Sequence, residues 1–157
     1  MSGSWRSSDL PNLNDGNHKV TSQPSDDYNC LAWAAGSDEK WWDPHPDYFW
    51  PDGLDRKASV EVFVQLYQKE GFEVCIGGLP EEGFEKIAIY ARDSADGKKK
   101  TPTHAARLLD SGEWTSKLGP CEDITHATVD AVHGPRYGEV LFYMSRLKRD
   151  LKPSTKS

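Results

Sequence analysis

The chain has 157 residues, of which 36% are hydrophobic and 28% charged, and this length suits one domain with its own buried core. Its formal net charge of −6 argues against binding to nucleic-acid phosphates, since such proteins usually present a basic face. No apolar run approaches the roughly 20 residues of a membrane span, and no signal peptide or disulfide framework is evident, so we expect a cytoplasmic protein with three free thiols.

The two ends of the chain have the composition of flexible segments. Residues 1–25 are rich in Ser, Asn, Asp, Gly and Pro and show no hydrophobic period, and residues 151–157 are similar. We therefore expect a flexible N-terminal arm, a single α+β domain over residues 26–150 and a flexible C-terminal tail.

Two helices are predicted ahead of most of the strands. The segment 29–36 is short and Ala-rich, with Asp27 or Asn29 near its N-cap and a glycine at its end. Residues 56–70 carry one apolar stripe with helical spacing, formed by Val60, Phe63, Val64 and Tyr67. Between the two helices, three prolines exclude a long regular element.

Strand-like segments dominate the rest of the chain. They cover residues 72–76, 86–91, 103–109, 114–118 and 139–145. Residues 110–113 have the composition of a hairpin turn, and residues 124–133 are expected to form a short helix. Helices followed by a mostly antiparallel sheet of about five strands indicate an α+β fold.

One pair of residues has the chemistry of a nucleophile and its base. Cys30 stands at the predicted start of a helix, where free N–H groups favour an anion and lower the pKa of a thiol. His104 begins a predicted strand, from which its ring could act as the acid and base that a thiol nucleophile needs. The return strand of the hairpin brings Ser116 near His104, where a polar group can fix the imidazole tautomer.

The order of these residues resembles the papain-like cysteine hydrolase superfamily, and in size the compact NlpC/P60 and CHAP branches. The resemblance is carried by NCLAWA at 29–34, THAARL at 103–108 and WTS at 114–116. It implies a papain-like fold, Cys30 as nucleophile, His104 as base and Ser116 as the orienting residue. It also implies oxyanion donors at the helix start and an amide or ester substrate, from a peptide or a protein, with no metal or cofactor.

The chain departs from this family at several positions. Leu31 and Ala32 separate the cysteine from the next aromatic residue, and Ser116 replaces the usual His, Asn, Gln or acid at the third position. Glu122 and Asp123, on the loop that follows, are acidic alternatives for holding the imidazole. These departures leave open whether the substrate is that of a peptidase, an amidase or a deamidase.

Other interpretations of the same residues remain open. A cysteine on an Ala-rich helix is often inert core, which would make the chain a non-catalytic binding protein of the immunity or adaptor type. Zinc ligation by Cys121 and His126 together with Cys30 and His104 is a weaker alternative, because the spacing is unlike that of common zinc sites. An aromatic cluster either covers the core or recognises a substrate, and it includes Trp41, Trp42 and Trp50.

Overall fold

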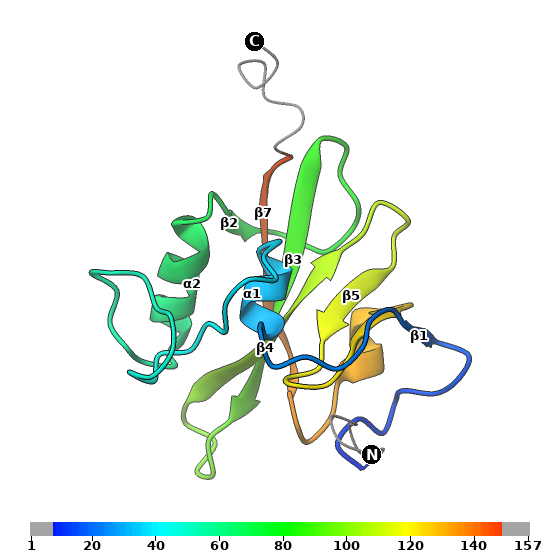
Figure 1. The fold of residues 1–157 in the computed structure, drawn as a ribbon, viewed down its shortest axis with the longest axis horizontal. Helices are drawn as coiled ribbons and strands as arrows, with labels where there is room; N and C mark the ends of the chain where they lie inside the picture. The colour runs from blue at the N-terminus through cyan, green and yellow to red at the C-terminus, as the bar shows by residue number, and fades with distance from the viewer. Residues whose placement is uncertain (1–7, 149–157) are drawn as a thin grey trace.

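Seven antiparallel strands form one open sheet in the computed structural model, which describes residues 8–148, and two short helices pack against it (Figure 1). From edge to edge the strands are β1 (His18–Val20), β6 (Asp123–His126), β5 (Trp114–Lys117), β4 (Lys100–Leu108), β3 (Phe84–Asp93), β7 (Glu139–Leu147) and β2 (Glu73–Cys75). The α+β class is confirmed, with seven strands in place of the expected five or so. The tail expected over residues 151–157 lies outside the described residues.

Side-chain caps explain where the two helices begin. In α1 (Cys30–Ala34), the Asn29 side chain accepts a hydrogen bond from the Ala32 N–H. In α2 (Val60–Gln68), the Ser59 side chain accepts one from the Val62 N–H. Each cap satisfies an N–H group of the first turn that has no partner within its helix. The cap at Ser59 makes α2 shorter than the predicted segment.

Strand β3, an inner strand of the sheet, separates two layers of the core. Ile87 and Ile89 pack with α1 and α2, whereas Ala88 and Tyr90 belong to a second cluster of buried side chains. This alternation follows from the strand geometry, in which successive side chains point to opposite faces. The 3-10 helix η1 (Val129–Val132) contributes to the second cluster. A residue of the neighbouring strand β4 therefore faces one layer or the other according to its position.

The guanidinium of Arg146 on β7 joins the ends of both helices to the sheet. Its Nη2 donates to the Ala35 carbonyl at 3.0 Å and its Nη1 to the Glu70 carbonyl at 2.8 Å. Its Nε lies 2.7 Å from a carboxylate oxygen of Glu85. Because Arg146 is buried, these charge-assisted bonds fix the position of α1 on the sheet.

Two strands were not expected from the sequence. The predicted helix over 124–133 is replaced by β6 and η1, because β6 finds pairing partners on both sides, β5 and β1. Residues 8–25, within the segment expected to be a flexible arm, include β1 and the buried side chains of Leu10 and Leu13. Their order comes from contacts with residues about 100 positions away, which local composition does not reveal.

Candidate active site

Asn29 positions Cys30 at the first residue of α1. Besides capping the helix, its side chain binds the backbone of Trp42, with Nδ2 donating to the carbonyl at 2.7 Å and Oδ1 accepting from the N–H at 3.1 Å. The start of α1 is thereby joined to the loop that precedes α2. Cys30 is held between this junction and β4, against which α1 packs.

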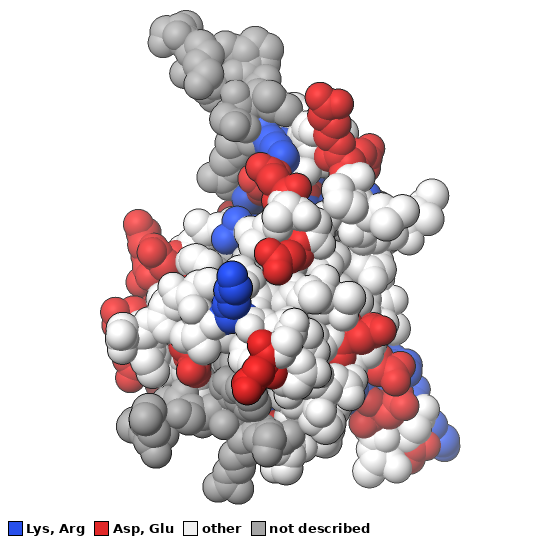
Figure 2. All heavy atoms as spheres, turned by 90° about the vertical axis from the view of Figure 1, so that its right-hand side faces the viewer, with Lys and Arg blue, Asp and Glu red and all other residues white. Residues whose placement is uncertain are grey.

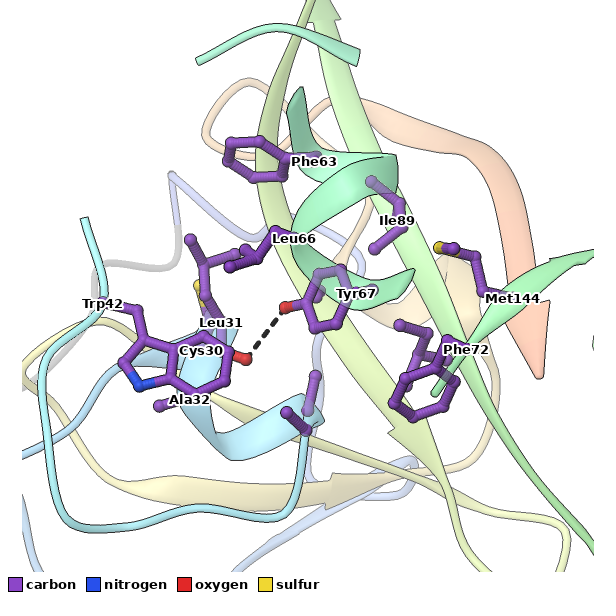
Figure 3. Close-up of a cluster of buried hydrophobic side chains, with 14 of the residues drawn as sticks. Cys30, Leu31, Ala32, Trp42, Phe63, Leu66, Tyr67, Phe72, Ile89 and Met144 are labelled. Atoms are coloured by element: carbon purple, nitrogen blue, oxygen red, sulfur yellow. Dashed lines mark hydrogen bonds between the residues drawn. The ribbon is translucent and has the colours of Figure 1, made fainter. Parts of the chain in front are cut away.

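The thiol of Cys30 is buried and uncharged. Only 8% of the residue is exposed, and Figure 3 shows it among packed side chains, near the hydrogen bond that Tyr67 donates to the Leu31 carbonyl. Burial raises the pKa of the thiol from 9.0 to about 11, although N–H groups of Ala105 and Leu31 and the charge of Lys117 act in the opposite direction. The low pKa expected at a helix start is therefore not found, because desolvation outweighs the N–H groups.

The imidazole of His104 lies among the rings of the second core cluster. It stacks on Tyr137 with a centroid distance of 3.9 Å and an angle of 14° between the planes, and the Tyr90 ring lies 5.2 Å away. Its Nε2 is 3.0 Å from Ser116 Oγ, the residue that the sequence places next to it across the hairpin. Its Nδ1 is buried and has no hydrogen-bond partner. Burial also holds the pKa of His104 well below its usual value, so the ring is neutral at pH 7.

A second histidine extends this arrangement. Ser116 Oγ lies 2.8 Å from His126 Nε2, and His126 Nδ1 lies 2.8 Å from the Thr128 carbonyl oxygen. His104 and Ser116 are fully buried, as is His126, and burial lowers the pKa of His126 to about 4. Local sequence patterns do not predict this contact, because they favour a helix over 124–133, whereas residue 126 lies on β6 beside the strand of Ser116.

The side chains of Cys30 and His104 lie in different core layers, although both are close to strand β4. The Cys30 thiol interacts with the backbone N–H of Ala105, the residue directly after His104. The side chain of Cys30 belongs to the helix-facing core, whereas that of His104 contacts rings of the other cluster. The structure thus brings His104 and Ser116 into contact and places the thiol beside the next peptide unit of β4, without a hydrogen bond to the ring.

The acidic alternatives to Ser116 have other surroundings. Both carboxylate oxygens of Asp123 accept from the Tyr28 hydroxyl, at 2.8 and 2.9 Å, and Glu122 has a buried oxygen with no hydrogen-bond partner. The hydrogen bond to the His104 ring comes from Ser116. Among residues 8–148, no three His, Cys, Asp or Glu side chains are grouped so that they could hold a metal ion.

The aromatic cluster separates into buried and exposed rings. Trp42 and Trp50 are core residues, with 6% and 3% of their surface exposed. Trp41 is half-buried and packs against Tyr48, while Tyr48 and Phe49 are 46% and 38% exposed. The rings of this cluster that a ligand could reach are therefore those of Trp41, Tyr48 and Phe49.

These features define an α+β protein with a buried cysteine, a histidine–serine–histidine chain and an exposed aromatic loop. The chain belongs to the family described as a domain of unknown function (DUF7689), whose model matches residues 19–145. Comparison with curated proteins gives no match, and comparison with solved structures gives none either. In the part of the chain that the structure describes, no helix has the length and apolar character needed to cross a membrane.

Proposed function

We propose that the protein is a cysteine hydrolase of papain-like architecture, which cleaves an amide or ester bond. The observation that carries this proposal is the state of the His104 ring. Its Nε2 is held by Ser116, while its Nδ1 is left without a partner. An unpaired nitrogen on a ring whose other nitrogen is fixed leaves a lone pair available to accept a proton, which is one requirement of a general base.

The proposed reaction uses three side chains and begins when the Cys30 thiol and the His104 ring, which the resting structure holds in different core layers, meet beside β4. His104 Nδ1 then accepts the proton of the Cys30 thiol as the sulfur attacks the substrate carbonyl. The imidazolium then gives this proton to the leaving amine or alcohol, and a thioester remains on Cys30. Water, deprotonated by His104, hydrolyses the thioester and restores the thiol. Ser116 holds the ring throughout, and N–H groups at the start of α1 and at Ala105 stabilise the oxyanion.

The proposed reaction needs a movement that exposes Cys30 and His104, because both residues are buried in the resting structure. Tyr137 covers one face of the imidazole and is itself only 5% exposed. Tyr137 belongs to a short loop between Gly134 and Gly138, which pair with each other and both have positive φ. In the proposed reaction, this loop moves to let a substrate reach Cys30 and His104. The thiol and the imidazole are neutral until then, which keeps the nucleophile protected from solvent.

Acyl transfer to Cys30 tests the proposal. The full chain is incubated with p-nitrophenyl acetate at pH 7.5, nitrophenolate release is followed, and the acetylated peptide is identified by mass spectrometry. We expect acetylation at Cys30 ahead of Cys75, although Cys75 is the more exposed thiol. The variant His104→Gln is expected to slow acetylation about 100-fold, the usual contribution of a general base.

Cys75→Ser is the matched control, because this thiol lies on β2 away from the site, and it should leave the rate at Cys30 unchanged. Acetylation that follows exposure, with Cys75 modified first and His104→Gln without effect, would contradict the hydrolase. That result would favour a non-catalytic binding protein.

The burial of Cys30 is the observation that favours this second candidate. A thiol with a raised pKa inside a packed core behaves as a small apolar side chain. The exposed rings of Tyr48 and Phe49 would then offer a contact surface for a protein partner. Acidic side chains are spread over the face shown in Figure 2. Pull-down with Tyr48→Ala and Phe49→Ala variants, compared with the wild type, tests for such a partner.

A further inference from the structure

A chain of three hydrogen bonds joins side chains of three neighbouring strands, β4, β5 and β6. It runs from the Thr128 carbonyl through His126 and Ser116 to His104, with heavy-atom distances of 2.8, 2.8 and 3.0 Å. Each side chain in it is fully buried, so water does not compete for these groups. The direction of the hydrogen bonds therefore follows from the donors and acceptors in the chain and from the neutral state of its histidines.

The direction is set by the carbonyl at the end of the chain. A carbonyl oxygen only accepts hydrogen bonds, so His126 Nδ1 must carry a proton and donate it to Thr128. Burial keeps the ring neutral by lowering the pKa of His126 to about 4. A neutral imidazole has one protonated nitrogen, and His126 Nε2 is therefore an acceptor.

The same reasoning continues to His104. Ser116 has one hydroxyl proton, and it donates this proton to His126 Nε2. The Ser116 oxygen can then only accept from His104, which makes His104 Nε2 the protonated nitrogen. Its Nδ1 is left with a free lone pair, and this is the atom that the structure leaves without a partner.

We propose that His126 is a positioning residue that acts through Ser116 to fix the Nε2–H tautomer of His104. This inference rests on the proposed hydrolase for its use in catalysis, since the base must present a lone pair to the thiol. Without the His126 acceptor, the Ser116 hydroxyl is free to turn and donate to His104 Nε2. The proton of His104 would then move to Nδ1 and remove the base.

Long-range proton–nitrogen NMR of the full chain labelled with ¹⁵N-histidine measures the tautomer directly. The chain has five histidines. We expect a protonated Nε2 and an unprotonated Nδ1 on His104 in the wild type. In His126→Phe, which keeps a flat ring but loses the acceptor, the two assignments should exchange. In Ser116→Ala, which removes only one atom, both tautomers should be populated.

The matched control is His133→Phe. His133 also contacts the Tyr90 ring, at 5.8 Å, but it makes its hydrogen bond to the Val140 backbone. This variant should leave the His104 tautomer unchanged. His126→Gln supplies an amide acceptor and donor in place of the imidazole, so more of the Nε2–H tautomer of His104 should remain than in His126→Phe. Acetylation of Cys30 should fall in His126→Phe toward the roughly 100-fold loss expected for His104→Gln, since the exchanged tautomer removes the same base.

Two results would overturn the inference. One is a protonated His104 Nδ1 in the wild type, and the other is an unchanged tautomer in both His126→Phe and Ser116→Ala. Failure of the hydrolase itself looks different. In that case Cys30 is not acetylated, yet the tautomer still responds to His126, which overturns the catalytic use and supports the structural control.

Discussion

The folded protein keeps the Cys30 thiol protonated at a pH at which an ordinary cysteine ionises. Its pKa is raised from 9.0 to about 11 by burial. Between these values the unfolded chain loses the proton while the folded one retains it, so the free energy of unfolding falls as pH rises above about 9. Urea unfolding at pH 8 and pH 10.5 should show a smaller decrease in Cys30→Ala than in the wild type. Equal decreases would mean that the thiol is not desolvated.

Tyr137 is the residue whose removal should open the site. In Tyr137→Ala the stacked ring at 3.9 Å from His104 is lost, and water reaches the imidazole. Since burial lowers the pKa of His104, its pKa should rise toward the ordinary value, which an NMR titration measures. Tyr137→Phe keeps the stacked ring and should leave the pKa low. A pKa that stays low in Tyr137→Ala would mean that other groups seal the ring.

At the scale of the element, the start of α1 depends on one amide side chain. Asn29→Ala removes the cap and both bonds to Trp42, and we expect a loss of about 2 kcal/mol in the free energy of unfolding. Asn29→Asp keeps the capping oxygen but loses the donor to the Trp42 carbonyl, and should lose less. Urea unfolding followed by tryptophan fluorescence measures both. Equal losses in Asn29→Ala and Asn29→Asp would mean that the bond from Asn29 Nδ2 to the Trp42 carbonyl accounts for the whole effect.

The elements that the sequence predicts are those with local signals. The cap before α1, the apolar stripe of α2 and the hairpin between β4 and β5 are all readable within about ten residues. The pairing of His104 with Ser116 followed from that hairpin. Strands β1 and β6 have no such signal, since each is defined by a partner elsewhere in the chain. The contact of His126 with Ser116 was not predicted for the same reason, and the sequence suggested His126 as a zinc ligand instead. Burial of Cys30 was one of the two alternatives that the sequence left open, and the structure shows the thiol buried.

At the scale of the whole molecule, the two faces of the sheet are closed in different ways. Helices α1 and α2 cover one face, while the other is closed by η1 and by the segment that leads into β1 (Figure 1). The segment continues into β1, which pairs with β6, and just after β1 the Thr21 N–H donates to the Asp123 carbonyl at 2.8 Å. The layer that holds His104 and His126 is thus completed by the first residues of the described chain.

This role of the N-terminal segment gives a direct test of the architecture. Leu10 is fully buried in the second core cluster, and Leu10→Ala should lower the free energy of unfolding by about 3 kcal/mol, as for other core leucines. Val20 on β1 is 54% exposed, and Val20→Ala should change the free energy of unfolding by less than about 1 kcal/mol. Urea unfolding of both variants measures the difference. If Leu10→Ala were as mild as Val20→Ala, the segment would not be part of the core, and the buried environment of His104 would have to come from η1 and Tyr137 alone.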